Sequence, residues 1–154
     1  MRPPGEGKSR LAPALAPAAR AMLVERMFRH VLHVATQVTA QCYVVSRSAF
    51  LRDLAVAAGA HAVAETGIGL NKALAEASAL VDPDLPVLAL SADLPLLTAS
   101  DLAALGGADV IAATDRAGTG TNALLLRRPG LIDYAFGEGS LARHRANAVA
   151  AGLS

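Results

Sequence analysis

The sequence contains little cysteine, few aromatic residues and almost no net charge, and each shortage excludes a class of protein. Cys42 is the single cysteine, so an intramolecular disulfide or a thiolate metal cage within the chain is impossible, and we expect a reducing, cytoplasmic setting. Two Tyr, three Phe and no Trp, together with a formal net charge of +1, provide neither stacking platforms nor a basic surface for nucleic acid.

Long apolar runs are also missing. No run approaches the roughly 20 residues that cross a bilayer, and the start MRPPGEGK has no hydrophobic signal core, so we expect no association with a membrane. Small aliphatic residues are abundant instead: 53% of the 154 residues are hydrophobic but only 3% are aromatic. This composition predicts one globular domain over residues 1–154 with a core of Ala, Leu and Val.

Helical and strand-like patterns alternate along the chain. Apolar spacing and capping residues predict helices over residues 17–33, 49–58, within 67–80, after Thr98 and over 141–151. Short β-rich runs predict strands over residues 38–45, 61–64, 86–91, 109–114 and 122–126. This alternation predicts an α/β fold with a mostly parallel sheet and flanking helices.

In open α/β sheets, ligands bind beyond the carboxyl ends of the strands, and Asp93 lies at such a position. It follows the apolar run 86–91, and Pro95 delays the next helix. A carboxylate there is suited to Mg²⁺, which takes one or two carboxylates together with substrate phosphates. A turn in which Asp93 accepts backbone N–H groups is an equally good interpretation.

Two glycine-rich segments indicate anion binding. The loop Gly118-Thr-Gly-Thr121 offers N–H groups and hydroxyls, although a hairpin turn would need only one of its glycines. The segment Gly137–Ser140 opens the last predicted helix, where N–H groups attract anions, although Ser140 also suits a plain N-cap. Arg143, His144 and Arg145 near that helix start oppose the helix dipole, and a bound anion would offset them.

Other familiar motifs do not fit. PGEGKSRL ends like a phosphate-binding P-loop, but Arg2 stands where a glycine is required, so Lys8 and Arg10 could belong to a flexible basic tail. Gly67-Ile-Gly69 lacks the third small residue of a dinucleotide motif. His30, His33 and His61 have no partner carboxylates at a useful spacing, which favours structural roles, and no nucleophile elbow occurs.

Several segments together resemble one enzyme family. They are Lys8-Ser-Arg-Leu-Ala-Pro13, Gly69-Leu-Asn71-x-Ala73-Leu74, Ser91-Ala-Asp93-Leu-Pro95-Leu-Leu97, Asp115-Arg-x-Gly-Thr-Gly-Thr-Asn-Ala-Leu-Leu-Leu126 and Phe136-Gly-x-Gly-Ser140-x-Ala-Arg-His144. From about residue 2 to 154 the sequence resembles the 2-phospho-L-lactate guanylyltransferases of coenzyme F(420) biosynthesis, whose bacterial members include phosphoenolpyruvate guanylyltransferases. The resemblance implies a nucleotide-diphospho-sugar transferase (GT-A-like) fold.

The resemblance also implies a reaction and roles for residues. GMP would pass from GTP to phosphoenolpyruvate, 2-phospho-L-lactate or 3-phosphoglycerate with release of pyrophosphate, and the product would go to a downstream transferase of coenzyme assembly. The resemblance implies that Lys8 and Arg10 lie along the triphosphate and act in catalysis, and that Asn71 lies near the nucleotide. It implies that Asp93 binds Mg²⁺ and acts in catalysis. Thr121, Gly137 and Ser140 would bind the acceptor acid, and Arg143 and His144 would be neighbouring substrate-binding helpers.

This sequence differs from the family pattern in two places, and other functional interpretations stay open. The family has a strand before the nucleotide loop and, after the region matched here, a segment Asp-x-Asp-Thr-Pro that supplies a second metal ligand, so this chain is expected to be truncated at both ends. A catalytically silent nucleotide-binding relative is one alternative. A molybdenum-cofactor guanylyltransferase is another, although its Gly-Gly-x-Ser-x-Arg-x-Gly loop is absent.

Overall fold

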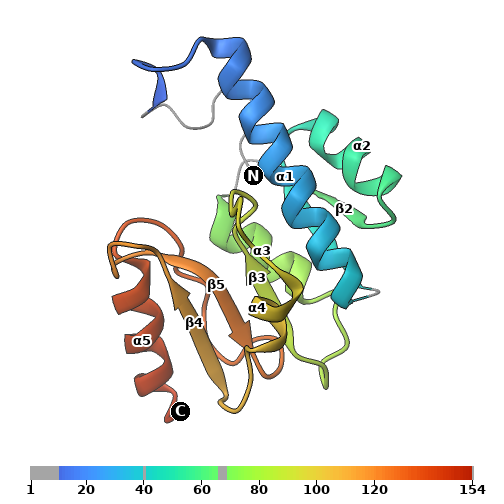
Figure 1. Cartoon of the computed structure of the whole chain (residues 1–154). Coiled ribbons are helices and arrows are strands. Elements are labelled where there is room, and N and C mark those ends of the chain that lie inside the picture. Colours follow the sequence, from blue (N-terminus) through green and yellow to red (C-terminus); the bar gives the residue numbers. More distant parts are fainter. Residues whose placement is uncertain (1–10, 40, 66–68, 154) are drawn as a thin grey trace. The chain divides into compact units, whose positions relative to one another are not determined.

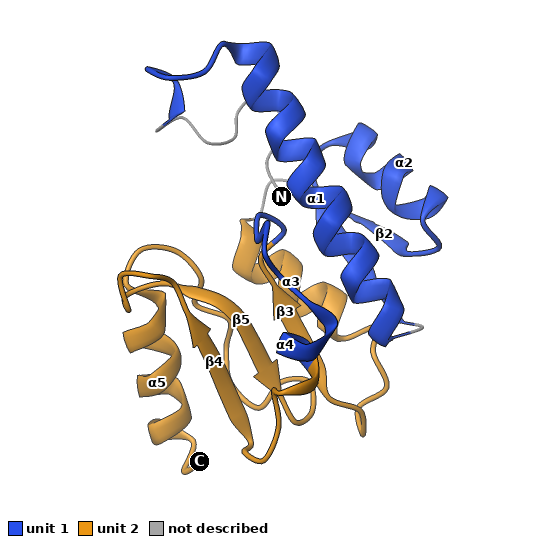
Figure 2. Cartoon of the chain, viewed as in Figure 1, with its two compact units in different colours: residues 1–67, 92–102 blue, residues 68–91, 103–154 orange. Residues whose placement is uncertain are grey.

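The computed structural model describes residues 11–39, 41–65 and 69–153. The chain divides into two compact units, one formed by residues 1–67 and 92–102 and the other by residues 68–91 and 103–154 (Figure 2). Lys8 and Arg10 lie outside the described residues. Each unit has its own hydrophobic core.

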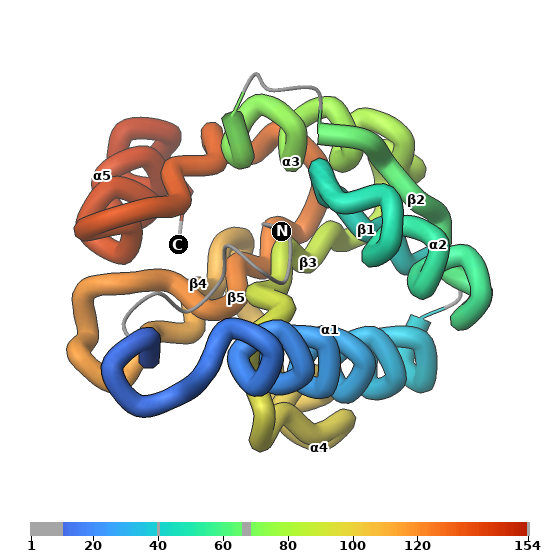
Figure 3. Tube along the Cα trace, turned by 90° about the horizontal axis from the view of Figure 1, so that it is seen from above, coloured from blue at the N-terminus to red at the C-terminus, as the bar shows by residue number. Residues whose placement is uncertain are grey.

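The first unit contains a parallel strand pair. Its elements are α1 (Pro17–Val38), β1 (Tyr43–Ser46), α2 (Ala49–Ala57), β2 (His61–Ala64) and most of α4 (Ala99–Ala103). Tyr43 is opposite His61 in the β1–β2 register, and the two rings stack with their centroids 4.9 Å apart. Helix α2 connects the strands and packs against both of them (Figure 3).

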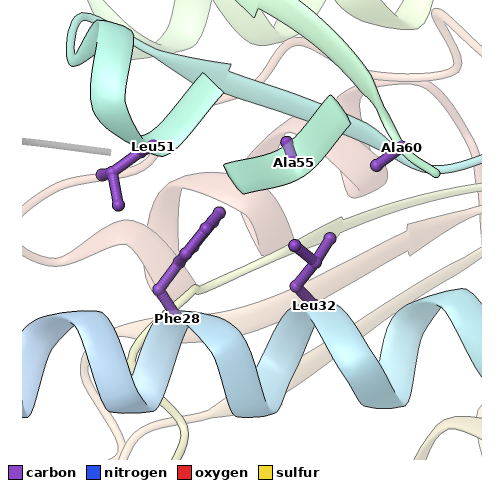
Figure 4. Close-up of a cluster of buried hydrophobic side chains, with 5 residues drawn as sticks. All are labelled: Phe28, Leu32, Leu51, Ala55 and Ala60. Atoms are coloured by element: carbon purple, nitrogen blue, oxygen red, sulfur yellow. The ribbon is translucent and has the colours of Figure 1, made fainter. Parts of the chain in front are cut away.

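The core of this unit is built from two helices. Phe28 and Leu32 of α1 point toward Leu51 and Ala55 of α2, and Ala60 completes the cluster (Figure 4). Their spacing of four residues puts each pair on one helix face, which is why periodicity predicted both helices. Pro17 occupies the first turn of α1, and the Ser48 side chain caps α2 by accepting the N–H of Leu51.

Thr98 and Asp101 form the predicted capping arrangement at α4. The Thr98 hydroxyl accepts the N–H of Asp101, while the Asp101 carboxylate accepts both the N–H and the hydroxyl of Thr98. Just before this cap, the Leu97 carbonyl lies 2.8 Å from His30 Nε2. The described structure thus gives His30 a main-chain partner 67 positions along the chain, a contact that links α1 to the start of α4.

The second unit contains an antiparallel sheet. Its elements are α3 (Leu70–Ser78), β3 (Val87–Leu90), β4 (Val110–Thr114), β5 (Thr121–Leu126) and α5 (Ser140–Ala150). Strand β5 lies between β3 and β4 and is antiparallel to both (Figure 1). The predicted α/β class is confirmed. Strands β1 and β2 pair in parallel, as expected. In the second unit β5 runs opposite to both β3 and β4, and the short hairpin that joins β4 to β5 forces those two strands into opposite directions.

The β4–β5 ladder contains a one-residue irregularity. Ala113 is opposite Ala123 but Thr114 is opposite Thr121, so Asn122 is an extra residue of the kind found in a β-bulge. Residues two apart normally share a face of a strand, and the bulge instead turns Thr121 to the face opposite Ala123. Thr121 therefore lies on the same face as Leu124 and Leu126.

That face carries the core of the second unit. Ala89 of β3 joins Leu124 and Leu126 of β5 and Ile132, with Ala148 of α5 packed against them. Ser140, His144 and Ala148 are spaced by four residues and so share the face of α5 that meets this core. The bulge and the helix spacing together bring Thr121 and two polar side chains of α5 to the same place.

Candidate functional site

A buried polar cluster joins the start of β5 to the first turns of α5. Thr121, Ser140 and His144 are only 7%, 1% and 1% exposed. The Ser140 hydroxyl donates to Thr121 Oγ1 at 3.2 Å, and His144 Nδ1 lies 3.1 Å from the same oxygen. We call these three residues the hydroxyl–imidazole cluster. Three of the residues expected to hold the acceptor acid or to help are thus in direct contact.

The other ring nitrogen of His144 is bound to the main chain. Ala135 N–H donates to Nε2 at 2.9 Å, and the Phe136 ring meets the imidazole edge-on with centroids 4.9 Å apart. Burial lowers the pKa of His144 below its ordinary value of 6.5, and the positive charge of Arg143 lowers it further. The imidazole is therefore neutral at pH 7.

Asn71 holds the segment formed by residues 133–139. Its Oδ1 accepts the N–H of Phe136 at 2.8 Å and its Nδ2 donates to the Phe136 carbonyl at 3.2 Å. The amide thus pairs with Phe136 as a neighbouring strand would. Asn147 adds a bond from Nδ2 to the Asp133 carbonyl. Sequence reasoning linked Asn71 only to the nucleotide and missed Asn147, because nothing in the sequence marks a contact between side chains and a distant main chain.

Arg143 holds the same segment from α5. Its Nε and one terminal nitrogen donate to the Ala135 carbonyl at 3.2 and 2.9 Å, and its other terminal nitrogen donates to the Glu138 carbonyl. Gly137, which has a φ of +126°, lies under this guanidinium. The carbonyl oxygens account for the positive charge of Arg143 near the helix start, so no bound anion is needed to explain it.

The start of α5 is occupied by protein groups. The N-cap residue is Gly139 and Ser140 is the first helical residue, so the alternative interpretation of Ser140 as a plain N-cap is wrong. Ser140 N–H donates to the Gly137 carbonyl and Leu141 N–H donates to the Thr119 carbonyl. These two N–H groups therefore have partners, and the Leu141 bond ties α5 to the β4–β5 hairpin.

Residues 115–120 form that hairpin loop. Asp115 Oδ1 accepts the N–H of Thr119 at 3.0 Å, and hydrogen bonds from the loop N–H groups, that of Gly120 first, lower the pKa of the Asp115 carboxyl. Gly118 has a φ of +70°, and a Cβ on Gly120 would lie 2.6 Å from Asp115 Oδ2. Both glycines therefore have a structural reason in the hairpin, whereas the sequence argument gave one to only a single glycine.

Asp93 lies two residues beyond Ser91, whose N–H donates to the Asn122 carbonyl as β3 ends. Its side chain is half-buried. Within the described residues, no group of three or more His, Cys, Asp or Glu side chains is arranged to hold a metal ion. An ion at Asp93 would therefore not be held by three or more such side chains of the described residues.

Comparison with known proteins gives the family. The family model described as "Guanylyl transferase CofC like" matches residues 2–154. The chain belongs to this guanylyl transferase family. A phosphoenolpyruvate guanylyltransferase of Chloroflexus aggregans is 40% identical over 158 residues, which cover 95% of this chain and 78% of the relative. A 3-phospho-D-glycerate guanylyltransferase of Phenylobacterium zucineum is 36% identical, covering 96% of this chain and 73% of the relative.

A solved structure supports the fold of this guanylyl transferase family member. A candidate nucleotide-diphospho-sugar transferase from Desulfovibrio desulfuricans G20 matches 100% of this chain and 74% of its own, with a TM-score of 0.76 and 17% sequence identity. The predicted nucleotide-diphospho-sugar transferase fold is thus confirmed. In the described parts of the chain, no helix combines the length and the apolar character that crossing a bilayer requires.

Proposed function

We propose that this protein transfers GMP from GTP to the phosphate of a small phosphorylated acid and releases pyrophosphate, in coenzyme F(420) biosynthesis. The observation that carries the proposal is the family match over residues 2–154, joined by relatives named for guanylyl transfer to two phosphorylated acids. Phosphoenolpyruvate, 2-phospho-L-lactate and 3-phospho-D-glycerate are the candidate acceptors. The product would be consumed by the downstream transferase of that route.

The reaction needs no nucleophile from the protein. A phosphate oxygen of the acceptor attacks the α-phosphorus of GTP, a new P–O bond forms, and the bond to the bridging oxygen of the β-phosphate breaks as pyrophosphate leaves. Both reactants are polyanions, so catalysis consists of alignment and of stabilising negative charge. Lys8 and Arg10 are the cations proposed along the triphosphate.

The acceptor is proposed to bind at the hydroxyl–imidazole cluster and at Gly137. Thr121 and Ser140 bring hydroxyl groups, and the segment 133–139 brings main-chain groups held in place by Asn71 and Arg143. Asn71 is also proposed near the nucleotide, in addition to its bonds with Phe136. The buried, neutral imidazole of His144 supports the hydroxyls without adding charge of its own.

Asp93 is the residue proposed to hold Mg²⁺. One half-buried carboxylate with no cluster of further ligands among the described residues fits an ion bound mainly through nucleotide phosphates. When bound, the ion would neutralise negative charge that develops on the phosphates. The protein itself contributes the Asp93 carboxylate, which lies shortly after the end of β3.

Pyrophosphate release tests the proposal directly. We expect release with GTP and Mg²⁺ and at least one of the three acids, and a fall of roughly 100-fold or more for Asp93→Asn, as for loss of a group that stabilises transition-state charge. Asp53→Asn, on α2, is the matched control and should keep full activity. Calorimetry showing GTP binding without release for any acid would instead favour the catalytically silent relative.

A further inference from the structure

The main chain fixes the tautomer of His144. Ala135 N–H donates to Nε2 at 2.9 Å, and an amide nitrogen can only donate, so Nε2 carries a lone pair. A neutral imidazole has one N–H group, which must then be on Nδ1. Nδ1 lies 3.1 Å from Thr121 Oγ1, so the imidazole is the donor in that contact.

The Thr121 oxygen therefore accepts twice. It receives the Nδ1–H of His144 and also the hydroxyl proton of Ser140 at 3.2 Å. A hydroxyl oxygen has two lone pairs, and both are used in these bonds. The proton of Thr121 is the one that remains to donate, and the described residues give Thr121 no further side-chain bond. The chain of bonds runs from Ala135 through His144 to Thr121, with Ser140 as the second donor.

We propose that His144 is a positioning residue that, together with Ser140, directs the Thr121 hydroxyl proton toward an anionic oxygen of the phosphorylated acid. This inference rests on the proposed function. An anionic oxygen only accepts hydrogen bonds, so a hydroxyl that already accepts two is forced to act as its donor. Without His144, Thr121 could donate to Ser140 instead, and the cluster would present a lone pair to the anion.

Burial makes the arrangement energetically important. All three side chains are at least nine-tenths buried, so the Thr121 proton, which the described side chains leave without an acceptor, gains from an anionic oxygen of the acid. The same burial holds the hydroxyl in one orientation before the acid arrives, which reduces the entropy lost on binding. The effect should therefore appear in the affinity for the acid rather than in that for GTP.

Two substitutions separate positioning from packing. His144→Phe keeps a ring against Phe136 but removes both hydrogen bonds, whereas the amide of His144→Gln can accept from Ala135 and donate to Thr121. At saturating GTP, His144→Phe should raise the KM for the acid roughly tenfold, as for loss of one hydrogen bond to a charged group, with kcat and the KM for GTP within about twofold. His144→Gln should restore most of the affinity. His33→Phe and His33→Gln on the exposed side of α1 are the matched controls.

Nitrogen spectroscopy tests the bond chain without using activity. Long-range proton–nitrogen correlation spectra of the wild-type protein distinguish the tautomers of its four histidines, and His144→Gln assigns the signal. We expect His144 to carry its proton on Nδ1. A proton on Nε2 would overturn the inference and leave the proposed function intact, and this measurement holds even where His144→Phe fails to fold.

The kinetic outcomes are equally separate. If the wild type is active and His144→Phe leaves the KM for the acid unchanged, the inference is overturned and the proposed function stands. The same holds if the KM for the acid is as high in His144→Gln as in His144→Phe. Wild type that releases no pyrophosphate with any of the three acids overturns the proposed function, and the inference falls with it.

Discussion

At the scale of single residues, His144 is the most constrained side chain of the candidate site. It combines near-complete burial with a main-chain donor on one nitrogen and a hydroxyl on the other. Protonation would place an N–H on Nε2, opposite the Ala135 N–H, and two donors repel. The folded state therefore requires the neutral ring, as the direction of the pKa change indicates.

This requirement makes stability depend on pH. The pKa of His144 is lower in the folded protein than its ordinary value of 6.5, so the unfolded chain binds more protons between the two values. The free energy of unfolding should be full above about pH 6.5 and should fall as pH decreases below it. Urea titrations of wild type and His144→Gln between about pH 5.5 and 7.5 measure this, within the range where histidine titrates.

The variant isolates the contribution of His144, because the other three histidines are present in both proteins. Wild type should lose stability more steeply than His144→Gln as pH falls through this range. Parallel curves would contradict the prediction. The Asp115 and Asp101 carboxyls, whose pKa values are lowered by hydrogen bonds, should reduce stability only at lower pH, as they become protonated.

At the scale of elements, the β4–β5 hairpin positions two parts of the candidate site, the start of α5 and the Thr121 side chain. Its loop is closed by Asp115, and its Thr119 carbonyl receives the N–H of Leu141 from α5. The bulge at Asn122 then turns Thr121 toward the helix. The hairpin thus sets both the start of α5 and the direction of the Thr121 hydroxyl.

Gly120→Ala should disturb this hairpin. The new Cβ would lie 2.6 Å from Asp115 Oδ2, so the carboxylate would have to move and its bond to Thr119 would weaken. We expect Tm to fall by roughly 2–4 °C, the shift that a modest destabilisation causes in a chain of this size. Thermal melts monitored by circular dichroism measure it.

A double-mutant cycle checks the cause. In an Asp115→Ala background the crowding atom is gone, so Gly120→Ala should lower Tm by clearly less than it does in wild type. Equal shifts in the two backgrounds would mean that the contact with Asp115 is not the reason. Gly106→Ala, where nothing lies within 4 Å of the added Cβ, is the matched control.

The sequence predicted the elements better than their pairing. Strand β2 has the predicted bounds, and α2 ends one residue before the predicted end, because Gly59 and local periodicity mark both. The β4–β5 hairpin was one of two interpretations of the loop at residues 118–121, whereas the antiparallel pairing of β5 with β3 was missed, since it depends on contacts far apart in the sequence. Within the site, the family resemblance pointed to Thr121 and Ser140. The hydrogen bonds between Asn71 and Phe136 join residues 65 positions apart, and no local sequence pattern predicts them.

At the scale of the whole molecule, the described residues form one hydrophobic core in each of the two units. The core of the second unit depends on two leucines of the central strand β5, Leu124 and Leu126, both 0% exposed. Their neighbours in this core include Ile132 and the partly buried Tyr134 and Phe136 as well as the small Ala89 and Ala148. Both leucines are fully enclosed, so shortening either side chain would remove buried apolar contacts and leave a cavity.

Leu124→Ala should cost about 2–5 kcal/mol of unfolding free energy, the range for a fully buried leucine whose cavity does not collapse. Chemical denaturation measures the change. Leu96→Ala, at a side chain that is 87% exposed, is the control and should change stability little. A loss below about 1 kcal/mol at Leu124 would mean that the surrounding core closes around the cavity.

The contacts of Asn71, Arg143 and His144 have a consequence for engineering. The main-chain conformation of residues 133–139 is fixed by hydrogen bonds to side chains that lie outside this stretch, on two different helices. A designer who transplants this stretch between relatives to change the acid they accept would transfer its sequence without the side chains that fix its main-chain conformation. A successful graft must therefore include Asn71, Arg143, His144 and also Asn147, which binds the Asp133 carbonyl.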